Sequence, residues 1–322
     1  MPLISAIVPV YNCEKYLPAT LDSILNQTFS DFEIIAVNNS SPDGCLQILQ
    51  DYAKRDARIR VLTRPNGGAG TARNAALDIA RGDFVVFCDG DDLLSPKTFE
   101  ILLSVQNETN ADVVCHGFKR IGSDATINDA VPDEDIKKIR TASGFAPIFR
   151  KKINVMACSK LFRRSLFDNL RFPAVKIAED FYTTFKVFER VKTAAYISNR
   201  LYFYRSHPMQ ITKRMTSEKI TDAFTVAELL SAELKRIPKK QLLYFSRYAA
   251  RYQLFSLLTP LFKASDSNLL ALFCNEWKKL EQNSVISARD LTVGRRFVLN
   301  ALLSGNYEKA RKRLELLKKI RL

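Results

Sequence analysis

Three carboxylates near residue 90 are the strongest candidates for chemistry in this sequence. Residues 84–88 form an uninterrupted apolar run, as expected for a parallel strand covered on both faces. Asp89, Asp91 and Asp92 follow it directly, and Gly90 lets the backbone turn and approach a ligand. Parallel strands carry ligands at their carboxyl ends, and carboxylate oxygens suit a hard divalent cation that also binds phosphates. A solvated turn is the alternative, because Asp-Gly is a common turn pair.

The elements that must position these carboxylates alternate regularly over the first 115 residues. Apolar runs predict strands at residues 4–10, 32–37, 58–62, 84–88 and 112–115. Helices are predicted between them, with Asn12, Ser41-Pro42 and Ser95-Pro96 as their start signals. This alternation predicts an α/β fold with a parallel, doubly wound sheet. Its strand ends would bring Tyr11, Asn38, Arg73 and the Asp89–Asp92 turn to one edge.

Several familiar chemistries are disfavoured. The first strand lacks a G-x-G-x-x-G motif, the sequence has no G-x-x-x-x-G-K-[ST] motif, and the Gly67–Gly70 cluster comes after the third strand. The only histidines are His116 and His207, which excludes a His-rich metal centre and makes a carboxylate the expected base. The six cysteines have no paired spacing, which indicates buried free thiols in a reducing compartment.

The rest of the chain changes character towards its end. A polar loop is predicted at residues 123–135, a helix-like segment within 141–165, a helix after Glu179-Asp180 and a strand at 194–205. Beyond residue 216 the pattern is helical, with apolar faces at 229–234, 242–258, 269–277, 297–303 and 314–320. We therefore expect a boundary near residue 215 and a helical region at 216–322.

Positive charge is concentrated in the last third. Lys and Arg minus Asp and Glu gives −4 for residues 1–100, +6 for 101–200 and +13 for 201–322. An acidic partner is one interpretation, such as anionic lipid, a phosphorylated substrate or nucleic acid, and a solvated helical surface is the other. No apolar run reaches the roughly 20 residues of a membrane span, and no signal peptide is expected. These features predict a cytoplasmic protein, with peripheral attachment to the membrane if lipid is the partner.

Several segments together resemble the family 2 glycosyltransferases of the GT-A fold. They are Ile7-Val8-Pro9-Val10-Tyr11-Asn12, Glu33 to Asn39 with Asp43-Gly44, Gly70-Thr71-Ala72-Arg73-Asn74, Asp89-Gly90-Asp91-Asp92, Lys160 to Arg164, and Glu179-Asp180. Their order and spacing match over about the first two-thirds of the chain. The pattern is similar to bacterial enzymes that build capsular polysaccharide and lipopolysaccharide.

The resemblance implies a Rossmann-like, mostly parallel sheet with a nucleotide-binding half at residues 1–115 and an acceptor half at 116–215. It assigns expected roles as follows: Pro9, Tyr11 and Asn38 to the uridine pocket, Arg73 beside the base, Asp89 and Gly90 to the donor ribose, Asp91 with Asp89 to Mn²⁺ or Mg²⁺, Asp180 to the general base, and Glu179 and Lys160 to the acceptor side. His207 would contact the diphosphate or metal, or be a plain loop histidine.

Asn38 and its neighbours depart from the usual family pattern, and Asp180 has an alternative interpretation. The family usually has Asp where this chain has Asn38, and an amide oxygen can still accept the uracil N3 proton, though without charge. Asn39 and Ser40 also replace the usual Asp and Gly. For Asp180, an ordinary acid at a helix N-terminus is the alternative, and an Asp with a near-normal pKa can serve as the base because the proton leaves as the bond forms.

The resemblance implies an inverting, metal-dependent transfer of a hexose or N-acetylhexosamine from UDP-Gal, UDP-Glc or UDP-GlcNAc to a glycan or lipid-linked oligosaccharide. A sugar nucleotidyltransferase is disfavoured, because Pro9-Val10-Tyr11-Asn12 offers no basic, glycine-rich triphosphate loop. A non-catalytic relative that binds nucleotide or nucleic acid is the rival from another class. The aromatics between Tyr244 and Phe255, interleaved with Arg247 and Arg251, resemble a nucleic-acid stripe, but their helical spacing favours a core.

Overall fold

The computed structural model describes residues 1–126, 138–143, 154–235, 257–283 and 291–319. The chain divides into two compact units, Met1–His207 and Pro208–Leu322. The change from one unit to the other therefore comes before residue 215, the position indicated by the sequence pattern.

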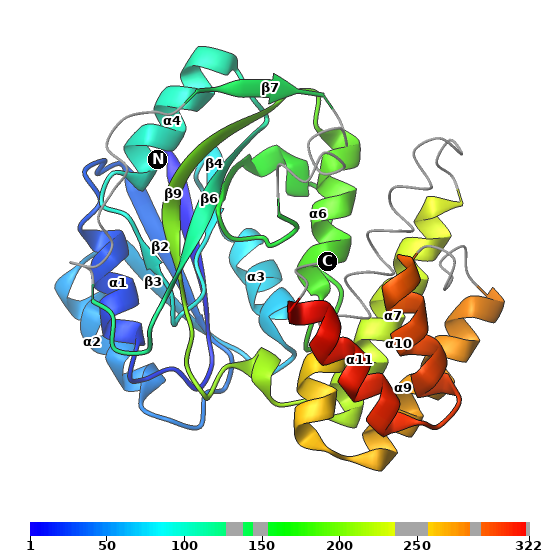
Figure 1. Ribbon diagram of the computed structural model, residues 1–322. Helices are drawn as coiled ribbons and strands as arrows, with labels where there is room; N and C mark the ends of the chain where they lie inside the picture. Colours follow the sequence, from blue (N-terminus) through cyan, green and yellow to red (C-terminus); the bar gives the residue numbers. More distant parts are fainter. Residues whose placement is uncertain (127–137, 144–153, 236–256, 284–290, 320–322) are drawn as a thin grey trace. The chain divides into compact units, whose positions relative to one another are not determined.

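The first unit is built on one mixed sheet of nine strands (Figure 1). Its strands are β1 (Ile4–Val10), β2 (Phe32–Asn38), β3 (Ile59–Thr63), β4 (Phe84–Phe87), β5 (Leu93–Leu94), β6 (Val113–Ile121), β7 (Arg140–Ala142), β8 (Lys160–Arg163) and β9 (Ala194–Arg205). Their order is β3-β2-β1-β4-β8-β6-β9-β5, and β7 pairs with β9. The predicted α/β class with a Rossmann-like sheet and flanking helices is confirmed, and the sheet predicted to be mostly parallel is mixed.

The sheet is parallel on one side and mixed on the other. β1 pairs parallel with β2 and β4, and β2 pairs parallel with β3, as the alternation of the first hundred residues predicts. The fifth predicted strand, β6, does not pair with this parallel set directly. β8 enters between β4 and β6 and runs antiparallel to both, because the chain returns from the second half of the unit to fill that position.

Among the described residues, these helices accompany the sheet: α1 (Leu17–Leu25), α2 (Cys45–Arg55), α3 (Ala69–Leu77), α4 (Thr98–Thr109) and α6 (Glu179–Arg190), with a short 3₁₀ helix, η2 (Arg164–Phe167). Three predicted start signals are wrong by several residues. Asn12 has a left-handed φ of 51° instead of capping α1. The Ser41 hydroxyl accepts the Asn12 N–H at 2.7 Å, so Ser41 joins two loops and does not cap α2. The helix α4 begins at Thr98 instead of Pro96.

An aromatic cluster fills the core behind the end of β4. The Phe87 ring makes edge contacts with Phe162, Phe167 and Phe172 at centroid distances of 5.6–5.9 Å. These rings come from β4, β8, η2 and the chain that follows η2. Burial of aromatic side chains is a large source of stabilisation, so this cluster fixes the strand from which the carboxylate turn emerges.

The second unit is helical, as predicted. It contains η3 (Ile211–Lys213), α7 (Ser217–Leu234), a helical segment at 257–264, α9 (Ser267–Asn283), α10 (Val293–Leu303) and α11 (Tyr307–Lys319). Its core includes Phe224, Phe273 and Trp277, with ring centroids 5.3–6.5 Å apart. In the described helices we find none with the length and apolar character to cross a membrane. Most of the predicted 242–258 helix, the aromatics 244–255 and part of the 141–165 segment lie outside the described residues.

Candidate active site

The polar turns that follow the parallel strands emerge at one edge of the sheet. Val10 at the end of β1 pairs with Asn38 at the end of β2, and Ile7 pairs with Phe87 at the end of β4. Pro9 is buried, whereas Tyr11 is 37% exposed. A Cβ at Gly90 would lie 3.2 Å from the Pro9 carbonyl oxygen and 3.0 Å from Cys13 Sγ, so a larger residue would force the two turns apart.

Arg73 of α3 joins two carboxylates that are far apart in the sequence. Its Nη2 donates to Asp89 Oδ1 at 2.8 Å, and its Nη1 donates to Glu179 Oε1 at 2.5 Å. The Arg73 side chain is only 4% exposed, and its guanidinium lies over the rings of Phe172 and Phe87, 5.5 and 6.0 Å from their centroids. Burial opposes the charge, but the two carboxylates hold the pKa of Arg73 well above its usual value. The arginine thus brings the start of α6 to the Asp89 turn.

Asp180 lies in the first turn of α6, next to Glu179. Burial, and then the negative charges of Glu179 and Asp89, raise the pKa of Asp180 to about 7, while Arg73 and Lys160 oppose the shift. The pKa of Asp180 is therefore above the near-normal value with which an Asp can also serve, because partial burial disfavours its ionised form. Ala178, which precedes α6, has a left-handed φ of 67°, an uncommon conformation for a residue with a Cβ. A carboxyl with a pKa near 7 can accept a proton at neutral pH.

Lys160 is fully buried at the start of β8. Its ammonium donates to Asn154 Oδ1 at 2.8 Å and to the Met156 carbonyl oxygen at 2.6 Å. Burial lowers the pKa of Lys160. The amine therefore holds the 154–158 segment, and its charge reaches Asp180 as one of the groups that oppose the upward pKa shift.

The structure also brings together Asp91 and His207, two further residues that were predicted for the site. His207 Nε2 lies 2.8 Å from Asp91 Oδ2, and the imidazole is 2% exposed, with its ring centroid 4.4 Å from that of Tyr16. The Asp91 carboxylate oxygen suits Mn²⁺ or Mg²⁺, whereas the His207 imidazole nitrogen is a softer donor that Mg²⁺ does not favour. Within the described ranges no three His, Cys, Asp or Glu side chains form a metal-binding group. A cation held by Asp91 would take most of its ligands from outside these side chains, such as phosphates and water.

A network that the sequence analysis missed holds the same turn from β9. The buried Tyr202 hydroxyl donates to Asp92 Oδ2 at 2.5 Å and accepts the Asp89 N–H at 3.2 Å. The backbone N–H of Arg205 donates to Asp92 Oδ1 at 2.7 Å, and its Nε donates to the Asp91 carbonyl oxygen at 2.8 Å. Burial and the charges of Asp91 and Asp89 raise the pKa of Asp92 well above its usual value. Asp92 is therefore an anchor for the two carboxylates beside it.

Asn38 is buried, and its side chain is partly engaged. Its Oδ1 accepts the Ser41 N–H at 3.1 Å, which leaves one lone pair of the oxygen for another donor. Neighbouring Asn39 donates to Asn66 Oδ1 and to the Gly68 carbonyl oxygen, at 3.0 and 3.2 Å. The two asparagines thus shape the loops after β2 and β3. No described contact joins Asn38 to the carboxylate cluster, although both lie at the same sheet edge.

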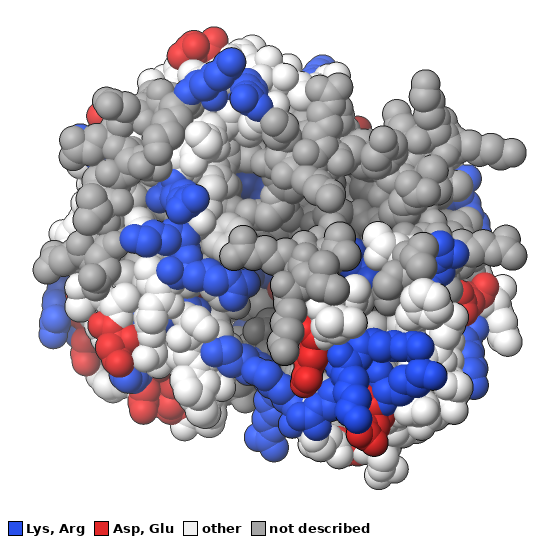
Figure 2. Space-filling model, viewed as in Figure 1, with Lys and Arg blue, Asp and Glu red and all other residues white. Residues whose placement is uncertain are grey.

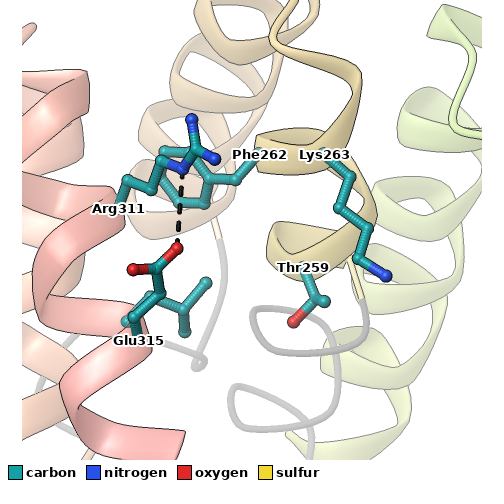
Figure 3. A pocket seen from close by; sticks show the side chains of 6 residues that line it. Thr259, Phe262, Lys263, Arg311 and Glu315 are labelled. Atoms are coloured by element: carbon teal, nitrogen blue, oxygen red, sulfur yellow. Dashed lines mark ion pairs between the residues drawn. The ribbon is translucent and has the colours of Figure 1, made fainter.

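A pocket of about 180 Å³ lies within the second unit (Figure 3). Arg311 and Glu315 of α11 face Thr259 and Phe262 across it, and Lys263 and Leu314 complete the lining. Arg311 Nε lies 3.6 Å from Glu315 Oε1, and both side chains are more than half exposed. A solvated ion pair of this kind is typical of a helix surface. The arrangement that can do chemistry is the one at the sheet edge of the first unit.

Comparisons with known proteins agree with this geometry. The family described as Glycosyl transferase family 2 matches residues 5–171. The chain is 36% identical over 220 residues to the uncharacterized glycosyltransferase EpsJ of Bacillus subtilis, covering 66% of this chain and 64% of EpsJ. It is 31% identical over 242 residues to the putative glycosyltransferase EpsH of the same organism, covering 73% and 70%. The chain thus spans slightly less than two-thirds of EpsJ.

The fold is also found in a solved structure. The crystal structure of Staphylococcus aureus TarS 1-349 in complex with UDP-GlcNAc has a TM-score of 0.76 and 23% identity, and covers 99% of this chain and 92% of that one. This likeness shows that the two share a fold. The family match extends over more than half of the chain and includes the turn with Asp89, Asp91 and Asp92. The chain therefore belongs to glycosyl transferase family 2.

Proposed function

We propose that this chain is an inverting, metal-dependent glycosyltransferase that moves a hexose or N-acetylhexosamine from a UDP-sugar to a glycan or lipid-linked acceptor. The observation that carries the proposal is the position of Asp180. Its carboxyl, with a pKa of about 7, belongs to the same charged cluster as Arg73 and the Asp89 turn. A proton acceptor would thus lie beside carboxylates that can hold a cation, and the cation in turn would bind the diphosphate.

The donor would bind to the half formed by residues 1–115. Pro9, Tyr11 and Asn38 would line the uridine pocket at the ends of β1 and β2, and Asp89 with Gly90 would meet the ribose. Arg73 would act by holding the Asp89 carboxylate in place, because its guanidinium is already bonded to that group. The UDP-GlcNAc named for the TarS complex supports a UDP-sugar as donor.

Asp91 and His207 would hold Mn²⁺ or Mg²⁺, with Asp89 as a further oxygen donor. Such a cation, when bound, neutralises charge on the departing diphosphate. To provide a ligand, His207 must be neutral, and its hydrogen bond to Asp91 must give way. Tyr202 and Arg205 would keep the turn fixed during this exchange, since they bond to its backbone and to Asp92.

Asp180 would accept the proton of the acceptor hydroxyl as the new glycosidic bond forms. Attack from the side opposite the diphosphate in one step inverts the anomeric centre. Residues 116–215 would form the acceptor half, with Glu179 holding Arg73 and Lys160 holding the 154–158 segment. TarS, described as a poly(ribitol-phosphate) beta-N-acetylglucosaminyltransferase, is 30% identical over 252 residues and supports a bacterial surface glycan as acceptor. An enzyme acting on a lipid-linked glycan would work at the cytoplasmic face of the membrane.

The experiment is to measure UDP release from a panel of UDP-sugars with Mn²⁺ present. We expect slow release through donor hydrolysis, which a chelator and the Asp91→Ala substitution both abolish. Asp83→Ala is the matched control, because exposed Asp83 precedes β4 whereas Asp91 follows it. Release that survives both the chelator and Asp91→Ala would exclude the metal role. Absence of release and of calorimetric binding for every UDP-sugar would exclude the donor class.

A further inference from the structure

Two large apolar side chains on packed helices of the second unit are exposed to solvent. Phe297 of α10 is 52% exposed, and Leu316 of α11 is 57% exposed. Arg313 of α11 links them: its Nη1 donates to the Phe297 carbonyl oxygen at 2.8 Å, and its guanidinium lies 5.3 Å from the centroid of the Phe297 ring. Leu316 follows Arg313 by three residues and so lies on the same side of α11. Two apolar groups therefore flank one cation.

More positive charge surrounds these groups. Lys309 and Lys312 are exposed and precede Arg313 and Leu316 by one helical turn each. Lys312 pairs with Glu308 at 2.6 Å, but both side chains are at least three-quarters exposed, so water screens the pair. Figure 2 shows Lys and Arg side chains gathered over the region of α11, with few acidic groups among them. We define the Phe297 patch as Phe297, Lys309, Lys312, Arg313 and Leu316.

The composition of the Phe297 patch favours one kind of partner. Residues 208–322 contain 22 Lys and Arg against 10 Asp and Glu, a net charge of +12. A second copy of this face would bring like charges together, which is unfavourable. Nucleic acid would satisfy the cations but would leave Leu316 without an apolar environment. A bilayer with anionic lipid provides both, because apolar side chains enter the acyl boundary while Lys and Arg reach the phosphates.

We propose that the Phe297 patch is the surface by which this protein docks on an anionic bilayer. The choice of partner rests on the proposed function, since an enzyme that glycosylates a lipid-linked acceptor must reach the bilayer surface. The residues of the Phe297 patch would make this contact with the bilayer. Phe297 and Leu316 would contribute by leaving water, and Arg313 by pairing with lipid phosphates.

The first test is sedimentation of the full chain with vesicles of phosphatidylcholine plus phosphatidylglycerol, against vesicles of phosphatidylcholine alone. We expect binding to the anionic vesicles only, and a loss of about five-fold in partitioning for each of Phe297→Ser and Leu316→Ser. Arg313→Gln should cost about five-fold at low salt and less at high salt. Leu229→Ser is the matched control, because Leu229 is 38% exposed on α7 and outside the patch, and it should bind as wild type.

The second test reports insertion directly and does not depend on a polar substitution. Trp277, the single tryptophan, is fully buried, so a tryptophan placed in the patch can be distinguished by quenching. In the Phe297→Trp variant, bromine-labelled anionic lipid should quench the new fluorescence, whereas the Leu229→Trp control should be unaffected. Equal quenching of the two variants would overturn the proposal.

Other outcomes would also contradict the proposal that the Phe297 patch docks on a bilayer. The proposal fails if the wild type does not bind anionic vesicles, binds neutral vesicles equally, or binds unchanged after Phe297→Ser and Leu316→Ser are combined. A wild-type dimer that this double variant converts to monomer, without a change in vesicle binding, would assign the patch to self-association. UDP release measured without vesicles separates the two proposals: it should be unchanged in every patch variant, and its absence in the wild type would count against the enzyme and not against the patch.

Discussion

The charged pairs at the sheet edge of the first unit differ from those on α11 of the second. Residues 1–207 contain 27 Lys and Arg against 24 Asp and Glu; the pairs Arg73–Glu179 and His207–Asp91 are largely buried, whereas Lys15–Asp124 in the same unit is solvated. Residues 208–322 have a net charge of +12, and the partners in Arg311–Glu315 and Lys312–Glu308 are one turn apart on the exposed side of α11. Buried charges polarise one another and shift pKa values, whereas exposed ones are screened.

This difference concerns how strongly each charge is coupled to its neighbours. Burial raises the pKa of the Asp180 carboxyl to about 7, and Arg73 links Asp89 and Glu179 through two hydrogen bonds. Solvated charges provide neither effect, but they remain available to an outside partner. Substitutions in the two units should therefore have very different consequences, even where the residue types are the same.

The largest effect is expected at Asp180. Asp180→Asn keeps the shape of the side chain but removes the proton acceptor, so kcat for sugar transfer or donor hydrolysis should fall by about 10³-fold. Donor binding should be almost unchanged, because the amide leaves the Asp89 turn intact. Steady-state UDP release and calorimetry with UDP measure the two quantities.

Asp168→Asn is the control for this loss, since Asp168 is exposed in the same unit. If Asp180→Asn retained more than about a tenth of wild-type kcat, general-base catalysis by this residue would be ruled out.

The next largest effect is expected on the free energy of unfolding, for a substitution of Arg73. Arg73→Gln removes the guanidinium from a site where its side chain is 4% exposed and leaves the Glu179 carboxylate, 9% exposed, without its partner. Breaking a buried pair in this way should lower the free energy of unfolding by about 3 kcal/mol. Urea denaturation followed by circular dichroism measures the change. A loss below about 1 kcal/mol would mean that water reaches the pair.

The pH dependence of the rate tests the environment of Asp180 without a substitution. The base must be ionised, and its pKa is raised to about 7, so activity should rise with pH and level off above pH 7. Below that value the rate should fall by about ten-fold per pH unit, which gives about 100-fold between pH 8 and pH 5. Initial rates of UDP release at saturating donor measure this profile. A profile that is flat over this range would show that the carboxyl titrates at its usual low pKa.

Part of this site could be predicted from the sequence. The apolar run at residues 84–88 and the carboxylates after it indicate a ligand-binding turn, and that turn is where β4 ends. The family pattern also placed Asp180, Arg73 and Asp91 in one site. The local pattern locates the end of β4 and its carboxylates because a continuous apolar run followed by polar residues is typical of a buried strand.

The partners of these residues could not be predicted. Tyr202 and Asp92 are 110 residues apart, and only the folded sheet brings β9 against the carboxylate turn. The position of β8 between β4 and β6 depends on the same long-range pairing. The raised pKa of Asp180 was missed because it depends on burial, which a helix N-terminal position does not reveal. Ser41 and Asn12 were read as helix caps because local propensity does not show that they bond to each other.

The smallest effect is expected when an arginine of the second unit, Arg311, is replaced by glutamine. Arg311→Gln breaks the pair with Glu315, but the two side chains are 56% and 58% exposed, so the free energy of unfolding should change by less than about 0.5 kcal/mol. Because Arg311 lies outside the sheet-edge cluster, UDP release should stay within about two-fold of wild type. Compared with Arg73→Gln, this variant measures the difference between a buried and a solvated arginine directly. Equal losses of stability in the two variants would remove the distinction between the units, whereas a loss of UDP release in Arg311→Gln alone would require the second unit to take part in the reaction.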